Sequence, residues 1–424
     1  MGIATRWRPA LAAALAVAAC SAAGAQLLPP VPVPDVGGTA GTIGRTADRA
    51  LGDATDNLET IRGDAGALAR ARVGRLEALV RAHRDRLEMT DAGPAVRGQV
   101  IALDPDPAAL AAALQAGFTR LAEERIEGLD LRFVTLAVPR GWPVDRALSR
   151  LRRIAPSGSF AANHLHGQSG AAATIGAAAL AQGRAAGSAA VGIIDGGVAA
   201  HPSLRSPVQQ RGFAAGAPSP SGHGTAVASL IAGQGPLRGA ASGAPLLVAD
   251  IYGRDPAGGN ALALARALGW MVAQRVRVVA VSLVGPSNPL VARAIGQARA
   301  RGTWIVAAVG NDGRAAPPAY PASYPGVIAV TGVDGRGRVL IEAGRALHLD
   351  YAAPAADMVA AAPGGALAPV RGTSFAVPFV AGRLAHHVGA GDPIAALDRE
   401  AAGRGRRGLG RGIICGDCRT VRRR

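Results

Sequence analysis

Lysine is absent from this sequence of 424 residues, so all 46 of its basic side chains are arginine. Aromatic residues make up only 3% of the chain. So few aromatic side chains offer little surface for base stacking, and the arginines are scattered rather than clustered, so we expect no nucleic-acid partner. The formal net charge of +17 still produces a long-range field that favours acidic or anionic partners.

Cysteine is also scarce, with three residues in the whole chain. Cys415 and Cys418 form a C-x-x-C pair, but no second pair or histidine cluster completes a zinc set. We expect a short-range disulfide of an oxidising compartment, or two inert thiols, rather than a redox site. The sequence holds no acidic loop dense enough to predict a calcium site. We therefore expect neither a metal nor a cofactor.

The N-terminus is typical of an export signal. Two arginines precede an apolar stretch over 10–19, which at roughly ten residues is too short to span a bilayer. Small residues at 23–25 suit signal peptidase, so we predict a signal peptide over residues 1–25. In a competing interpretation the segment ending at Cys20 is a lipobox, and Cys20 carries a lipid anchor. Both interpretations predict an exported protein of the periplasm, the outer membrane or the extracellular medium.

The first half of the chain divides into two regions by composition. Residues 26–90 contain a Pro-rich linker followed by leucines at roughly helical spacing, which indicates an amphipathic helical region over 46–88. Residues 91–165 predict a small α+β unit. Its expected elements are a strand over 96–103, a helix over 107–122, a strand over 129–138 and a helix over 144–154.

Residues 185–395 alternate between short apolar runs and helical stretches, followed by a basic Gly/Arg-rich tail over 396–424 that is typical of a solvated surface. Apolar strands that alternate with helices predict a mostly parallel central sheet with helices on both faces. In such sheets the reactive groups lie at the carboxyl ends of strands. The expected strands are 189–194, 246–251, 276–283, 303–309 and 327–333, and the expected helices are 222–233, 258–274 and 288–300.

Three segments of this region carry residues suited to nucleophilic catalysis. Asp195 ends an apolar run and is followed by glycines, His223 lies between glycines at the start of an apolar helix, and Ser374 opens another helix. Each alone has a structural explanation as a turn, surface or N-cap residue. Together, in the order Asp, His, Ser, they predict a catalytic triad. Asn311 follows a buried run and a glycine, and its side-chain amide is suited to an oxyanion hole.

The His-Gly-Thr motif at 223–225 and the Gly-Thr-Ser-x-Ala-x-Pro motif at 372–378 resemble those of the subtilisin-like serine proteases, over roughly 185–390. The resemblance implies an endopeptidase that acts on protein or peptide substrates through an acyl-enzyme intermediate. It implies Asp195, His223 and Ser374 as the triad and Asn311 as the oxyanion residue. It also implies that residues 91–165 are a pro-domain that inhibits its own enzyme, so that the protein is made as a zymogen. The substrate-binding residues implied are Ser282, Leu283, Val284 and Gly285.

Two positions depart from the pattern of that family. Gly196 stands where serine or threonine is usual, which removes a hydroxyl but leaves the carboxylate of Asp195. Val284 stands where glycine is common, and its side chain is expected to crowd the substrate backbone or to narrow the primary pocket. Two other functions remain open at this point: an inactive protein of the same fold that binds or scaffolds in the envelope, and a serine hydrolase of esters. The Gly-Thr-Ser context argues against the esterase, which usually carries Gly-x-Ser-x-Gly.

Overall fold

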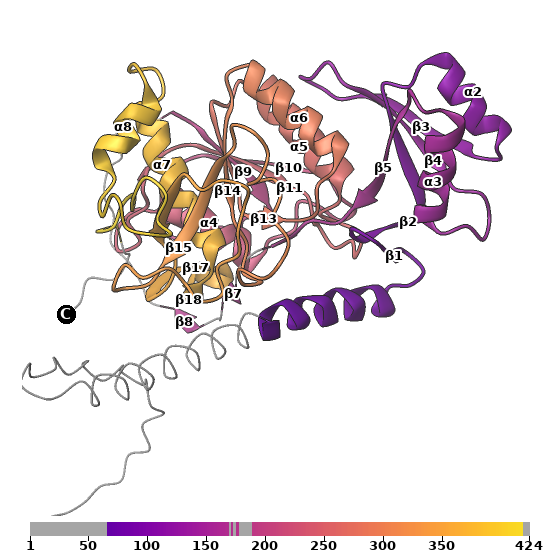
Figure 1. The fold of residues 1–424 in the computed structure, drawn as a ribbon. Helices are drawn as coiled ribbons and strands as arrows, with labels where there is room; N and C mark the ends of the chain where they lie inside the picture. The colour runs from indigo at the N-terminus through magenta and orange to yellow at the C-terminus, as the bar shows by residue number, and fades with distance from the viewer. Residues whose placement is uncertain (1–65, 169–170, 173–174, 178–188, 419–424) are drawn as a thin grey trace, which may run out of the picture. The chain divides into compact units, whose positions relative to one another are not determined.

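The computed structural model describes residues 66–168, 171–172, 175–177 and 189–418, all within one compact unit, residues 59–424 (Figure 1). The predicted signal peptide, Cys20, the Pro-rich linker and the start of the amphipathic region lie outside the described residues. Of that region the structure describes one helix over 66–82, here called the N-terminal helix. Among the helices described here, none is both long and apolar enough to cross a bilayer.

A small antiparallel sheet follows the N-terminal helix, and its strands run in the order β1-β2-β4-β3, with β5 paired to β2. It begins at Leu87, before the boundary expected at 91, so the end of the predicted helical region is a strand. Helices α2 and α3 cover one face, where they share a core with β2, β4 and β5. The elements are β1 (Leu87–Thr90), β2 (Gly93–Leu103), α2 (Pro107–Gln115), β3 (Thr119–Arg125), β4 (Arg132–Ala137), α3 (Val144–Ile154) and β5 (Ser159–His164).

The helix predicted over 107–122 is shorter than expected. It ends at Gln115, because Gly117 adopts a left-handed conformation with φ of 90° and turns the chain back. Phe118 is then buried in the core of the small sheet, and Thr119–Arg125 pairs with β4. The helix predicted over 144–154 has those bounds in the structure.

The central sheet has seven parallel strands in the order β10-β11-β9-β12-β14-β15-β16, which confirms the predicted fold class. Neighbouring residues of each strand face opposite cores: Ile193 packs with α4 and α7, whereas Ile194 packs with α5 and α6. The strands are β9 (Val191–Asp195), β10 (Val208–Gly212), β11 (Leu246–Asp250), β12 (Val278–Val281), β14 (Trp304–Ala308), β15 (Ile328–Val333) and β16 (Tyr351–Pro354). The helices are α4 (Gly222–Ala232), α5 (Ala261–Ala273), α6 (Pro289–Ala300) and α7 (Val377–His387).

The free face of the small sheet packs against the central domain. Phe133, Ile101 and Ala161 belong to the same apolar cluster as residues of α5 and α6. Figure 1 shows β5 leading from the small sheet toward these two helices. The small sheet is therefore held by burial of apolar side chains on both of its faces.

The end of the described chain is more buried than a solvated tail. Helix α8 (Pro393–Glu400) crosses the boundary expected at 395. Leu409, Ile413 and Ile414 are buried, and Ile413 forms bridges to Ala352 of β16 and to Ala402. A disulfide joins Cys415 and Cys418. The arginines of this segment are exposed, but its apolar residues anchor it on the edge of the central sheet.

Candidate active site

Glycines bring the end of β9 and the start of α4 into close contact. Ser221 caps α4 by accepting a hydrogen bond from Gly224 N at 2.9 Å. A Cβ atom on Gly196 would lie 2.5 Å from Ser221 Oγ, and one on Gly224 would collide with the Gly196 carbonyl. Only glycine therefore fits at 196 and 224, which explains why a hydroxyl residue is missing after Asp195 and places His223 beside the strand end.

His223 and Asp195 form a buried pair. His223 Nδ1 lies 2.8 Å from Asp195 Oδ2 and 3.0 Å from Oδ1. The ionised carboxylate only accepts hydrogen bonds, so Nδ1 carries the hydrogen and neutral His223 has its lone pair on Nε2. That Nε2 atom is buried and has no hydrogen-bond partner among the described residues. Asp195 Oδ1 also accepts from Gly196 N at 2.7 Å and from Gln168 Nε2 at 2.9 Å.

Ser374 lies on the short helix η2 (Thr373–Phe375), which precedes α7 and is in contact with α4. Its carbonyl oxygen accepts a hydrogen bond from Ser282 Oγ at 2.9 Å, which ties η2 to the end of β12. The next residue, Phe375, packs its ring against that of His223 with centroids 5.2 Å apart. Gly372 enters η2 with φ of 133°, a conformation that favours glycine. The Gly-Thr-Ser motif thus folds into a turn in which Ser374 directly precedes Phe375, the residue that packs against His223.

Asn311 is oriented by the same turn. Its Oδ1 accepts a hydrogen bond from Thr373 N at 2.9 Å, and Thr373 Oγ1 donates to the Gly310 carbonyl at 3.1 Å. Because the oxygen end is used by Thr373, the amide N–H groups form the opposite end of the side chain. Gly310 has φ of 88°, which lets the chain turn sharply after β14.

The predicted substrate strand is paired with another part of the same chain. Strand β13 (Leu283–Val284) pairs antiparallel with β6 (Gly167–Gln168), with Leu283 opposite Gln168 and Val284 opposite Gly167. Val284 lies opposite Gly167, which has no side chain, and it also lines the adjoining pocket, so the expected crowding of a substrate by Val284 stays a prediction. Gly285 hydrogen-bonds Tyr320 through both its N–H and its carbonyl, so it braces the strand end.

Two buried histidines lie at the junction of β5 and β6: His164 ends β5, and His166 directly precedes β6. Burial lowers the pKa of His164 to about 4, and burial together with the neighbouring His164 lowers the pKa of His166 to about 4. His164 contacts Thr90 Oγ1 and Asn288 Nδ2 at 3.2 and 3.3 Å. The ring nitrogens of His166 have no partner among the described residues, and the ring lies against Gly285. Both rings are therefore neutral in the folded chain at pH 7.

Acid is expected to destabilise this region. The unfolded histidines have a pKa near 6.5, so between about pH 6.5 and 4 the unfolded chain binds more protons and the free energy of unfolding falls as pH falls. Each histidine contributes a loss of at most about 3 kcal/mol across that window. Urea titrations of the uncleaved Ser374→Ala chain from pH 7 to 4 check this. His166→Leu, which removes no hydrogen bond, should flatten the pH dependence, whereas half-exposed His348→Asn serves as the control. An unchanged slope in His166→Leu would contradict the assignment.

Comparison with known proteins agrees with this fold. The model of the subtilase family matches residues 187–394. Over 205 residues the chain is 34% identical to subtilisin BL of Lederbergia lenta, covering 46% of this chain and 74% of that protein. It is 34% identical over 174 residues to the major intracellular serine protease of Bacillus subtilis, covering 39% of this chain and 54% of that one. Fervidolysin of Fervidobacterium pennivorans, a keratinolytic enzyme related to subtilisin, superposes with a TM-score of 0.63 at 19% identity, covering 78% of this chain and 62% of that one.

A parallel sheet with helices on both faces, and an Asp–His pair at the carboxyl ends of its strands, define a subtilisin-like serine endopeptidase. The chain belongs to the subtilase family. The matched segment corresponds to the central domain and excludes the N-terminal helix and the small sheet.

The sequence motifs did not reveal several residues of this site. Gln168 contacts Asp195, Thr373 orients Asn311, and Gly167 pairs with Val284. Asp312 directly follows Asn311, and it pairs with arginines of the N-terminal helix. Adjacency to Asn311 is a signal that was available for Asp312, and Thr373 lies within the serine motif. Nothing in the local sequence around 167–168 indicates that these residues reach the site.

Proposed function

We propose that this chain hydrolyses peptide bonds in protein or peptide substrates with Ser374 as nucleophile, His223 as general base and Asp195 as the group that orients His223. The observation that carries the proposal is the buried His223–Asp195 pair, whose geometry leaves the Nε2 lone pair of His223 directed away from Asp195. A neutral imidazole fixed in this tautomer is what a serine hydroxyl needs to lose its proton at neutral pH.

The reaction follows from these roles in two halves. His223 Nε2 takes the hydroxyl proton while Ser374 Oγ bonds to the scissile carbonyl carbon, and it then gives that proton to the leaving amine. Asp195 stabilises the imidazolium formed between the two transfers. Water repeats the sequence on the acyl-enzyme and releases the acid. Asp195 is well placed for this role because it is fully buried and is also bonded by Gly196 N.

Two donors are suited to the negative charge that develops on the carbonyl oxygen. They are the side-chain amide of Asn311, held by Thr373 N, and the backbone N–H of Ser374. The N-terminus of α7 lies close after Ser374 in the chain, and its partial positive charge also stabilises the negative carbonyl oxygen. A donor of this kind is typically worth roughly 3 to 4 kcal/mol of transition-state stabilisation.

We also propose that the chain is made as a zymogen in which residues 91–165 inhibit the site. Burial of the small sheet against α5 and α6 supports this. So does β6, which occupies the strand expected to bind substrate while Gln168 bonds Asp195. Ala171 pairs with Arg371, close to Ser374, whereas Gln168 pairs with Leu283. These two pairings support self-cleavage of the chain, and we expect the mature N-terminus between about 150 and 190.

Export remains part of the proposal, to the periplasm, the outer membrane or the medium, with either cleavage after residue 25 or a lipid on Cys20. The Cys415–Cys418 disulfide supports an oxidising compartment.

Hydrolysis of casein, compared with hydrolysis of a short-chain ester, tests the proposed activity. We expect the purified protein to degrade casein and to cleave internal peptide bonds, because β13 offers main-chain pairing to an extended peptide. Weak cleavage of activated esters is compatible with this. Ester hydrolysis without any release of peptides from casein would refute the endopeptidase, and inactivity on both would favour a binding protein of the same fold.

A further inference from the structure

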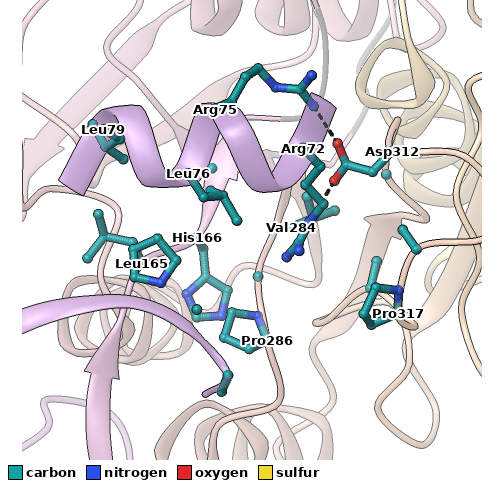
Figure 2. A pocket seen from close by; sticks show the side chains of 18 of the residues that line it. Arg72, Arg75, Leu76, Leu79, Leu165, His166, Val284, Pro286, Asp312 and Pro317 are labelled. Atoms are coloured by element: carbon teal, nitrogen blue, oxygen red, sulfur yellow. Dashed lines mark hydrogen bonds and ion pairs between the residues drawn. The ribbon is translucent and has the colours of Figure 1, made fainter. Parts of the chain in front are cut away.

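A pocket of about 570 Å³ lies beside the proposed oxyanion residue, under the N-terminal helix (Figure 2). Gly310 and Asp312, the two neighbours of Asn311 in the chain, both line it. In the proposed mechanism Asn311 binds the carbonyl that Ser374 attacks, so a pocket lined by both chain neighbours of Asn311 is placed to receive the side chain of the residue that carries that carbonyl. The pocket therefore binds the side chain of the substrate residue just before the cleaved bond.

Asp312 is the acidic group at this end of the pocket, and its side chain is 20% exposed. Arg72 Nε lies 3.1 Å from Asp312 Oδ2, and an Arg75 guanidinium nitrogen lies 2.7 Å from Oδ1. Figure 2 shows Arg72 and Arg75 reaching from the N-terminal helix to the two oxygens of one carboxylate. Both carboxylate oxygens are thus used by guanidinium groups, the donors that match a carboxylate best.

The walls of the pocket suit the rest of an arginine side chain. Val284, Val309 and Pro317 line it with apolar surface. Such surface can cover the methylene stem of an arginine while its guanidinium meets an acid. At the other side of the pocket Asp255 is likewise bonded by an arginine, Arg86, at 3.1 Å. Two of the acids that line this pocket, Asp255 and Asp312, are therefore paired with arginines that precede the small sheet.

We propose that Asp312 makes this pocket select an arginine side chain in the substrate. Arg72 of the N-terminal helix occupies the position of that side chain until the helix dissociates from the central domain. The proposal rests on the proposed function, because it assigns the pocket to the residue before the cut bond. The helix is then an intramolecular competitor that supplies the same guanidinium group. Arg72 and Asp312 both line the pocket, so their ion pair is made within the pocket.

The test compares kcat/KM for two fluorogenic peptides that differ only in having arginine or leucine before the cut bond. We expect the active protein to prefer the arginine peptide, and Asp312→Asn to reduce that preference by about 10- to 100-fold, since a hydrogen-bonded charge is lost. Asp334→Asn, which removes one carboxylate outside the pocket, should keep the wild-type preference.

Equal cleavage of the two peptides by the wild type, or a preference that survives in Asp312→Asn, would overturn the proposal. A second measurement does not depend on hydrolysis. In the Ser374→Ala chain that also carries Arg72→Ala and Arg75→Ala, N-acetylarginine amide should bind at least about tenfold more tightly than N-acetylleucine amide. Adding Asp312→Asn should make the two affinities equal. If no peptide is hydrolysed, the proposed function fails, and this binding comparison still decides the role of Asp312: equal affinities before Asp312→Asn is added would refute it.

Discussion

Replacing Ser374 with alanine is expected to lower kcat for peptide hydrolysis by about a million-fold, the loss typical when the nucleophile of a Ser–His–Asp triad is removed. The residual rate comes from substrate binding and the oxyanion donors alone. The change in the side chain is small, and the hydrogen bond that the carbonyl of residue 374 accepts from Ser282 Oγ is kept. The fold should therefore survive, and the loss can be read as chemistry rather than unfolding.

The same variant tests self-processing. In a protease-deficient host, Ser374→Ala should accumulate as a precursor of nearly full length, whereas the wild type should yield a mature chain that begins between 150 and 190. N-terminal sequencing measures both, and it also shows whether Cys20 carries a lipid. Ser242→Ala, which loses only a hydrogen bond to the Gly233 carbonyl, is the matched control and should process normally. Normal maturation of Ser374→Ala would show that another protease cuts the chain.

Replacing Asp195 with asparagine is expected to lower kcat by about ten-thousand-fold. The amide keeps the shape of the carboxylate. In the native chain Oδ2 lies 2.8 Å from His223 Nδ1 and accepts its hydrogen, whereas an NH₂ group at that position cannot accept a hydrogen bond. His223 then favours the tautomer with hydrogen on Nε2, which cannot take the proton of Ser374. Peptide hydrolysis across a range of pH measures the effect, and activity should recover partly at high pH, where hydroxide can take the proton of Ser374 in place of His223.

Asp250 provides a matched control for that substitution. It lies opposite Asp195 in the register of β9 and β11 and is fully buried as well. Its carboxylate accepts hydrogen bonds from Tyr252 N, Gly253 N and Ser219 N. Asp250→Asn should therefore lower the thermal stability, but kcat should stay within roughly tenfold of the wild type, because no catalytic tautomer depends on it. A loss in Asp195→Asn no larger than in Asp250→Asn would remove Asp195 from its proposed role.

Most strands of the central sheet could be predicted from the sequence because they are buried on both faces, whereas the half-exposed edge strand β10 escaped prediction. The run 189–194 and all of 303–309 except Thr303 lack polar side chains, and the structure has β9 and β14 there. Strand β16 (Tyr351–Pro354) escaped prediction, because four residues rich in alanine give no period of their own. The helix over 107–122 was extended too far, because the Ala and Leu pattern continues past Gly117, where the backbone turns.

The contacts that complete the site could not be predicted, because they join residues far apart in the chain. Arg75 and Asp312 are 237 residues apart, and each in isolation is an ordinary surface charge. Gln168 approaches Asp195 only because the small sheet packs on α5 and α6 and delivers β6 to β13. The motif residues were recognisable because glycines and a helix start fix their local backbone, whereas the pairing of β6 depends on the packing of two whole units.

Labelling with a fluorophosphonate probe, followed by mass spectrometric mapping, tests the central claim most directly. The probe reacts with a serine only when a neighbouring base makes its hydroxyl nucleophilic. We predict that processed protein is labelled on Ser374 alone, and that labelling becomes far slower in His223→Ala. Absence of any label on correctly folded, processed protein, or a label on another serine, would contradict the assignment of Ser374, His223 and Asp195 as the catalytic triad.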